Sequence, residues 1–159
     1  MQTAKTNALR LLDSKKIPYT LHVYDSEDGQ IHGTAVAGKI GLPEERVFKT
    51  LVAHSGPQLY VFVIPVAAEL DLKKAAKAVG AKKLEMLPVK DLLPWTGYVR
   101  GGCSPVGMKK LYPTCIDESA GTLPAIGVSA GKIGLQMELS PLQLADLTRA
   151  TFCQLTKEQ

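Results

Sequence analysis

The sequence predicts an α+β domain organised around a mixed, curved sheet. Helical and strand patterns alternate along the 159 residues, and two apolar strand patterns, 47–54 and 58–65, are separated by a short Ser-Gly-Pro turn. Two strands joined in this way form a β-hairpin, and because hairpin strands run antiparallel, the sheet cannot be purely parallel. The chain shows no internal repeat and no linker, so we expect residues 1–159 to form a single domain.

The first part of the chain carries the signals of two helices and one strand. Residues 6–16 place their apolar side chains on one helical face, and Pro18 ends this helix. Residues 19–24 alternate in a way that is typical of a strand. The pattern over 33–40 predicts a second, short helix, which the Gly-Leu-Pro sequence at 41–43 ends.

A lysine-rich helix follows the hairpin. Asp71 is a good amino-terminal cap, the helix runs to about Val79, and Gly80 stands where a carboxy-terminal cap belongs. The apolar positions share one side, which leaves the lysines facing water. Those lysines are Lys73, Lys74 and Lys77.

The remaining elements are shorter. The patterns predict a helix over 89–93, strands near 98–100, 114–117 and 125–129, a helix over 141–147 and a last strand near 152–155. Ser140 and Pro141 are the preferred residue types for the cap and first position of a helix. The glycines between 127 and 135 indicate a further bend, for which a β-turn or a bulge is sufficient.

Composition restricts the class of protein. The chain is 45% hydrophobic and 21% charged, close to an average soluble domain, and no apolar run reaches the ~20 residues of a membrane span. The first residues show no signal-peptide core, so we expect a cytoplasmic protein. The net charge of +4 permits a nucleic-acid partner without requiring one.

The cysteines and histidines point to no metal or nucleophilic site. Three widely spaced cysteines favour neither a disulfide framework nor a zinc site, and none of the three histidines is spaced with a second His, Cys or Asp in a ligand pattern. Cys103 has no histidine near it in sequence, and Pro105 after Ser104 is wrong for a hydrolase nucleophile elbow. We therefore expect Cys103 to be a small packing residue and predict no metal and no cofactor.

The loop 101–107 is the most informative single segment. Its sequence is Gly101-Gly102-Cys103-Ser104-Pro105-Val106-Gly107, and Lys109 and Lys110 follow closely. Glycines allow backbone N–H groups to converge on one point, where they can bind a phosphate, a carboxylate or an oxyanion. An ordinary turn between two elements is the alternative.

Lys49 is the residue most suited to chemistry. It lies within the strand pattern 47–54, whose two faces are both mostly apolar, so we expect it to project from a buried strand into a cavity or a paired site. The alternative is an edge-strand lysine that points to solvent. Tyr19, at the start of the first strand, is by default a core or rim aromatic, and otherwise a stacking surface for a base.

Six segments, in order along nearly the whole chain, carry a resemblance to a known family. They are 17–19 (Ile-Pro-Tyr), 47–51 (Val-Phe-Lys-Thr-Leu), 70–77 (Leu-Asp-Leu-Lys-Lys-Ala-Ala-Lys), 80–83 (Gly-Ala-Lys-Lys), 98–107 (Tyr-Val-Arg-Gly-Gly-Cys-Ser-Pro-Val-Gly) and 128–132 (Val-Ser-Ala-Gly-Lys). Together they resemble the YbaK/EbsC family of Cys-tRNA(Pro) deacylases. The resemblance implies a mixed six- to seven-stranded sheet, curled toward a barrel and flanked by helices, as in the editing domain of prolyl-tRNA synthetases.

The resemblance also implies an activity and a site. The activity is trans-editing: hydrolysis of the ester in mischarged Cys-tRNA(Pro), with the substrate's own thiol attacking the carbonyl and no cofactor. Lys49 matches the family's catalytic lysine. The residues implied to bind substrate are Tyr19, Gly101, Gly102, Ser104, Pro105 and Gly107. The implied partners are the 3′ end of tRNA and prolyl-tRNA synthetase, with no membrane and no DNA.

One departure from the family pattern leaves the substrate open. Family members often carry an acidic residue where this chain has Gln136, which can form hydrogen bonds but holds no charge. A deacylase for another small amino acid, such as alanine, is therefore an alternative. A noncatalytic tRNA-binding or synthetase-associated module, resting on the lysine-rich helix, is another.

Overall fold

The computed structural model describes residues 5–158, which form five α-helices and eight strands. The order is α1 (Asn7–Ser14), β1 (Thr20–Val23), α2 (Gly33–Ile40), β2 (Phe48–Ser55), β3 (Gln58–Pro65), α3 (Leu72–Val79), β4 (Glu85–Met86), α4 (Val89–Thr96), β5 (Thr114–Asp117), β6 (Ile126–Ser129), β7 (Leu135–Leu139), α5 (Pro141–Thr148) and β8 (Thr151–Cys153). Two short 3-10 helices, η1 (Glu44–Arg46) and η2 (Glu118–Thr122), join neighbouring elements. The predicted α+β class is confirmed.

The strands form two sheets that meet at one point. One sheet has three antiparallel strands in the order β1-β7-β6, and the other has the order β4-β2-β3-β5-β8, with parallel pairs at β3–β5 and β5–β8. A parallel bridge between Val47 and Gly127 joins them. The sheet is therefore mixed and curved, as predicted, but it is divided in two and does not close as a barrel.

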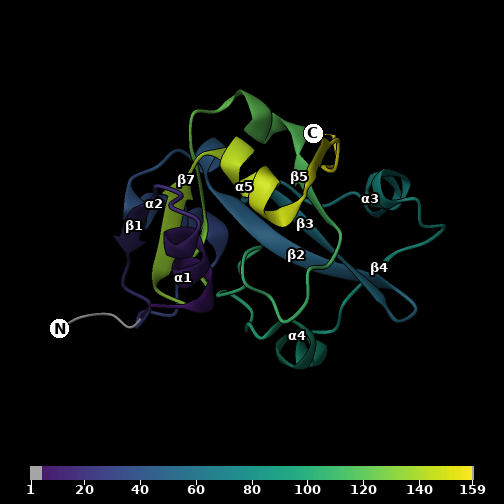
Figure 1. Ribbon diagram of the computed structural model, residues 1–159, viewed down its shortest axis with the longest axis horizontal. Helices are drawn as coiled ribbons and strands as arrows, with labels where there is room; N and C mark the ends of the chain where they lie inside the picture. The colour runs from purple at the N-terminus through teal and green to yellow at the C-terminus, as the bar shows by residue number, and fades with distance from the viewer. Residues whose placement is uncertain (1–4, 159) are drawn as a thin grey trace.

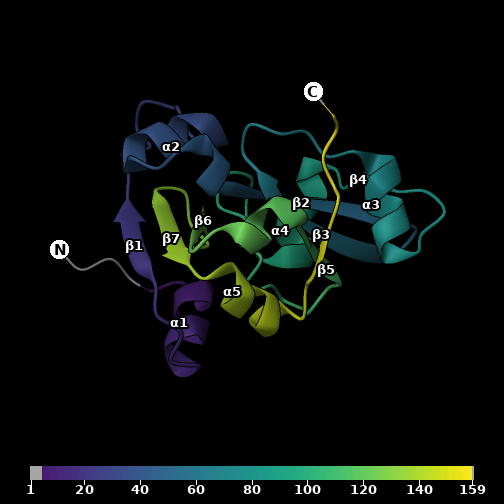
Figure 2. The same ribbon diagram turned by 90° about the horizontal axis from the view of Figure 1, so that it is seen from above.

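Helices cover both faces of each sheet. Figure 2 shows the three-stranded sheet between α2 on one side and α1 and α5 on the other. In the larger sheet, Ala53 and Phe62 pack against α3, whereas Val52 and Val61 belong to the cluster on the α4 side. Figure 1 shows α3 and α4 on opposite sides of the β2–β3 hairpin. The two faces of β2 thus belong to different packing layers.

Capping residues mark where several helices begin and where α3 ends. Thr6, Asp71 and Ser140 each accept a hydrogen bond from a backbone N–H of the first turn. Gly80 adopts the left-handed conformation that ends α3. The short helix predicted over 89–93, α4, continues to Thr96 and contains Pro94 in its final turn.

The sequence patterns did not predict two of the strands, and one strand that they predicted is absent from the described structure. The short β4 and the strand β7 were not expected, although Leu135, Met137 and Leu139 alternate with polar residues in β7. The strand expected at 98–100 is absent from the described structure. There Tyr98 is inserted into the core and its hydroxyl donates to Val106 O at 2.6 Å, so the alternation reflects one buried aromatic rather than a ladder.

Gly102 offers a test of this packing. A Cβ atom at Gly102 would lie 2.9 Å from the backbone N of Ile133 and 3.2 Å from two backbone atoms of Lys132, so the hairpin turn would have to move. We expect Gly102→Ala to lower the free energy of unfolding by roughly 1–3 kcal/mol, measured by urea denaturation.

Gly38 is the matched control for this substitution. It lies within α2 and a Cβ atom there would meet nothing within 4 Å. Gly38→Ala should therefore stabilise the protein by roughly 0.5–1 kcal/mol through helix propensity. Equal effects at the two positions would contradict the close approach at Gly102.

Candidate functional site

One face of the three-stranded sheet is lined by polar side chains, and we call it the polar face. Cross-strand partners share a face, and the register pairs His22 with Gln136 and Ser129 with Gln136. Tyr24 continues the alternation of β1, because its backbone N donates to Gly134 O at 2.9 Å. The polar face consists of Thr20, His22, Tyr24, Ser129, Gln136 and Glu138. The opposite face of the same strands packs into the largest core cluster.

Lys49 lies on the same side as the polar face. The bridge from Val47 to Gly127 places these two residues side by side, and alternation then directs Lys49 to the side of Val47. Val47 packs under α2, and Leu51, two residues beyond Lys49, packs under α3. Lys49 therefore stands between two helix-covered stretches, which explains why it is only half-buried.

Burial changes the acid–base behaviour of Lys49. Partial removal from water lowers the pKa of its ammonium group, and the Glu69 carboxylate counteracts part of this effect. Glu69 itself is exposed and forms an ion pair with Lys157 at 3.4 Å. Lys49 is thus a cation whose charge is partly desolvated, and a negative charge that develops near it would be stabilised.

Two buried polar atoms on the polar face have no hydrogen-bond partner. They are the Gln136 Oε1 atom and the Tyr24 hydroxyl, and their residues are only 6% and 7% exposed. A buried polar group without a partner costs roughly 1–3 kcal/mol, so natural proteins rarely keep one without a use. Both groups thus keep unused hydrogen-bonding capacity on the face toward which Lys49 is directed.

Gln136 is held against the junction of the two sheets. A Cβ atom on Gly127 would lie 3.6 Å from Gln136 Oε1, 3.6 Å from a methyl of Leu42 and 3.8 Å from a methyl of Val47. The amide oxygen therefore lies next to the strand that carries Lys49. Glycine at 127 leaves room for this approach.

A second group of charges fixes the far end of the polar face. Glu138 accepts hydrogen bonds from His22 Nε2 and Arg46 Nη2, both at 2.9 Å. Two partners leave the carboxylate little freedom. We assign this group to structure, because it holds β1, β7 and η1 together.

The two ends of loop 101–107 lie in different places. Gly101 and Gly102 lie against Ile31 and the hairpin turn 132–133, next to the end of the polar face. Ser104 is fully buried, and its hydroxyl accepts from Val106 N at 3.2 Å, so it turns inward. Only the first two glycines of this loop therefore lie near the end of the polar face.

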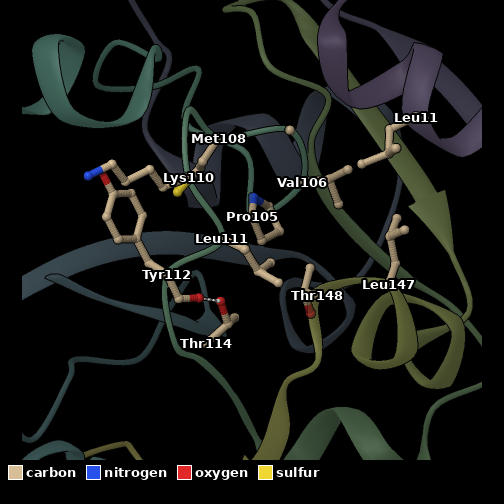
Figure 3. Close-up of a pocket in the computed structure, with 11 residues that line it drawn as sticks. Leu11, Pro105, Val106, Met108, Lys110, Leu111, Tyr112, Thr114, Leu147 and Thr148 are labelled. Carbon is tan, nitrogen blue, oxygen red and sulfur yellow. Dashed lines mark hydrogen bonds between the residues drawn. The ribbon is translucent and has the colours of Figure 1, made fainter.

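The remainder of the loop borders a separate cavity. Pro105 and Gly107 line a cavity of about 160 Å³ between α1, α5 and the segment 108–114. Figure 3 shows Leu11 and Leu147 facing it from the two helices. Lys49 is not among its lining residues, so Pro105 and Gly107 border a different place from Lys49.

Tyr19 lies away from the polar face. It packs against the core cluster that fills the other side of the sheet, and its hydroxyl donates to Asp13 Oδ1 at 2.9 Å. Burial and this hydrogen bond both raise the pKa of Tyr19. Tyr24 is the tyrosine that the fold brings to the polar face, and the predicted strand 19–24 would have placed it there with His22.

The thiol of Cys103 is protected. The side chain is 7% exposed, and burial raises the pKa of the thiol to about 12. At neutral pH the group stays protonated, and a thiol is a far weaker nucleophile than a thiolate. This agrees with the predicted packing role. Among residues 5–158 no cluster of His, Cys, Asp or Glu has the arrangement of a metal site.

The fold and the site define a class: an α+β protein with a half-buried lysine beside a polar sheet face. Residues 33–147 match the family model of the aminoacyl-tRNA editing domain. A protein of Enterococcus faecalis with the provisional name Cys-tRNA(Pro)/Cys-tRNA(Cys) deacylase EbsC is 47% identical over 158 residues, which is 98% of this chain and 95% of that protein. The chain belongs to the aminoacyl-tRNA editing domain family.

Solved structures share the fold. One, described provisionally as a trans-editing enzyme for prolyl-tRNA synthetase, matches with a TM-score of 0.83 and 22% identity over 98% of this chain and 100% of the other. A hypothetical protein matches with a TM-score of 0.85 and 18% identity over 96% and 100%. In the part of the chain that the structure describes, no helix is long and apolar enough to cross a membrane.

Thiol reactivity tests the role of Cys103. We expect iodoacetamide at pH 8 to modify Cys103 and Cys115 in the native protein at least ~100-fold more slowly than in urea, because burial raises their pKa values to about 12 and about 11. Peptide mass spectrometry would follow each site, with the partly exposed Cys153 as internal control. Rapid native labelling of Cys103 would contradict its assignment as a packing residue.

Proposed function

We propose that this protein is a trans-editing deacylase that removes cysteine from mischarged Cys-tRNA(Pro). The observation that carries the proposal is that half-buried Lys49 is directed to the side of the polar face, where Gln136 Oε1 and Tyr24 Oη have no hydrogen-bond partner within the protein. Family membership and the name of the 47% identical relative support the same reaction. Charged tRNA is then the substrate, and the cytoplasm, where tRNA is charged, is the expected compartment.

The site needs no nucleophile of its own under this proposal. The thiol of the bound cysteine attacks its own ester carbonyl, so that a C–S bond forms and the C–O bond to the ribose breaks. The thiol proton passes to the departing ribose oxygen, which leaves a cyclic thiolactone and a free tRNA 3′ end. The protein supplies orientation and a stable position for the oxyanion.

Each residue of the proposed site has a distinct role. Lys49 stabilises the oxyanion with its partly desolvated charge, while Gln136 and Tyr24 hold the polar groups of the aminoacyl end. Gly101 and Gly102 hold the loop against Ile31 and the turn at residues 132–133, at the end of the polar face. The structure gives Tyr19, Ser104, Pro105 and Gly107 contacts away from Lys49, so we assign them to support of the site.

The competing hypothesis is that the protein is a noncatalytic tRNA-binding module. It would rest on the lysines of α3, but the Lys74 ammonium donates to Thr156 O at 2.8 Å and so helps to hold the carboxy-terminal segment. Lys73 and Lys77 remain on that helix. Release of several cysteines per protein molecule would exclude this hypothesis. Loss of tRNA binding when only the α3 lysines are replaced would support it.

We also propose prolyl-tRNA synthetase as a partner, since that enzyme would generate the mischarged substrate. Co-sedimentation of the two purified proteins with tRNA would test the association. Its absence would limit the proposal to substrate released into solution, without affecting the reaction itself.

Replacing Lys49 tests the catalytic step. We expect Lys49→Ala to reduce kcat for hydrolysis of Cys-tRNA(Pro) by at least ~100-fold, because loss of one oxyanion-stabilising group typically costs ~3 kcal/mol. Release of labelled cysteine from purified Cys-tRNA(Pro) would measure it. Lys16→Ala, an exposed lysine beyond α1, is the matched control. Equal rates for Lys49→Ala and this control would refute the assignment.

The identity of the amino acid tests the substrate-assisted step. If the substrate thiol is the nucleophile, serine and alanine esters of the same tRNA should react at least ~100-fold more slowly than the cysteine ester. Single-turnover deacylation of the three charged tRNAs would separate rate from binding. Faster release of alanine than of cysteine would instead favour the alanine deacylase.

A further inference from the structure

The surface around α4 combines exposed apolar side chains with positive charge. We call it the α4 surface and define it by Lys90, Leu93, Trp95, Val99, Arg100, Lys109, Lys110 and Leu111, all of them exposed. Trp95 is 43% exposed and is the chain's single tryptophan. Several large apolar side chains exposed on and around one helix are typical of an interaction surface, whereas a single one would not be.

The end of α4 is anchored so that Trp95 has a fixed backbone. The last carbonyls of a helix lack partners within it, and here the segment 109–112 supplies them. The Lys109 ammonium donates to Pro94 O at 3.0 Å, the Tyr112 hydroxyl to Trp95 O at 2.6 Å, and Lys109 N to Thr96 O at 3.1 Å. The buried Tyr112 ring thus ties the helix to the body of the protein. The indole is presented by a rigid support.

The charge excess of the chain is concentrated in this region. Residues 82–111 contain six Lys and Arg against two Asp and Glu, and the rest of the chain has thirteen of each. The whole net charge of +4 therefore arises within these thirty residues. Lys90, Arg100 and Lys110 of this stretch are exposed members of the α4 surface, where they would attract a polyanion.

The α4 surface leads directly to the proposed site. From Trp95 the chain passes through Val99 and Arg100 to Gly101, which lies against Ile31 and Ile133 at the end of the polar face. Six residues span at most about 22 Å. A flexible single strand that lies along Trp95 and Arg100 can therefore place its end at the first glycines of the loop.

We propose that the α4 surface binds the unpaired 3′ nucleotides of the tRNA substrate, with a base stacked on Trp95 and phosphates paired with the surrounding lysines. The inference rests on the proposed function for the identity of the RNA. Aromatic platforms combined with cations are the usual way in which proteins hold single-stranded nucleic acid. The exposed leucines alone would suit a protein partner, but the concentrated positive charge favours RNA.

The single tryptophan makes the test direct. We expect uncharged tRNA to quench the intrinsic fluorescence of the protein saturably, and tRNA lacking its four 3′-terminal nucleotides to bind at least 5-fold more weakly with little quenching. Uncharged tRNA has no ester, so this readout is independent of hydrolysis. Absence of quenching by intact tRNA in a preparation that hydrolyses Cys-tRNA(Pro) would overturn this inference alone.

Variants separate stacking from charge. With labelled RNA and anisotropy, Trp95→Ala should weaken binding by about 5- to 150-fold, the equivalent of one lost stack, and Trp95→Phe should recover most of it. Changing Lys90 and Lys110 to Gln should lower the slope of log affinity against log salt by about 1.4. Leu142→Ala, at an exposed apolar residue on α5, and Lys15→Gln with Lys16→Gln are the matched controls.

Two results would count against an RNA surface. Unchanged affinity in both the Trp95 and the lysine variants would exclude a direct contact. Quenching by purified prolyl-tRNA synthetase without RNA, together with no quenching by tRNA, would assign the surface to a protein partner and overturn the proposal. Circular dichroism of each variant would confirm that the fold is retained.

Discussion

The contact between Val47 and Gly127 determines the geometry of the rest of the molecule. It is the bridge that joins the two sheets, and Val47 O also accepts from Val66 N at 2.9 Å, which fixes the end of the hairpin. Because Gly127 has no side chain, Gln136 and Leu42 can approach this junction closely. The bridge then sets which side of β2 faces the polar side chains of β6 and β7, and so directs Lys49 to them.

One face of β2 packs in the core, and the other carries the lysine of the proposed site. Phe48 and Val52 belong to the clusters that hold the inner part of the glycine loop, whereas Lys49 emerges between the stretches covered by α2 and α3. Loop 101–107 therefore mainly contributes to packing, because the Ser104 hydroxyl and the Cys103 thiol are buried. Only its first two glycines reach the edge of the polar face. A glycine-rich sequence indicates close approach of backbones, but here the approaching group is mostly the protein itself.

The sequence was sufficient for the elements whose signals are local. The cap at Asp71 and the hairpin 47–54/58–65 needed no tertiary information, because capping and turn chemistry act over a few residues. The prediction of a strand at 98–100 was wrong because Tyr98 gives an alternating apolar pattern although its side chain is buried in the core. Tyr24 was missed because its importance depends on a cross-strand neighbour over a hundred residues away. Registers between distant strands set the site, and no local pattern encodes them.

Under the proposed reaction, selectivity for cysteine comes from the thiol of the substrate. The protein's own Cys103 is held as a neutral thiol by burial, so the reactive sulfur has to arrive on the substrate. Apolar contacts alone distinguish small side chains poorly, since one extra or missing methylene is worth only about 1–3 kcal/mol. A reaction that requires the substrate's thiol rejects serine and alanine at the chemical step, whatever their affinity. The polar face then needs only to orient the ester and stabilise charge, which Lys49, Gln136 and Tyr24 are placed to do.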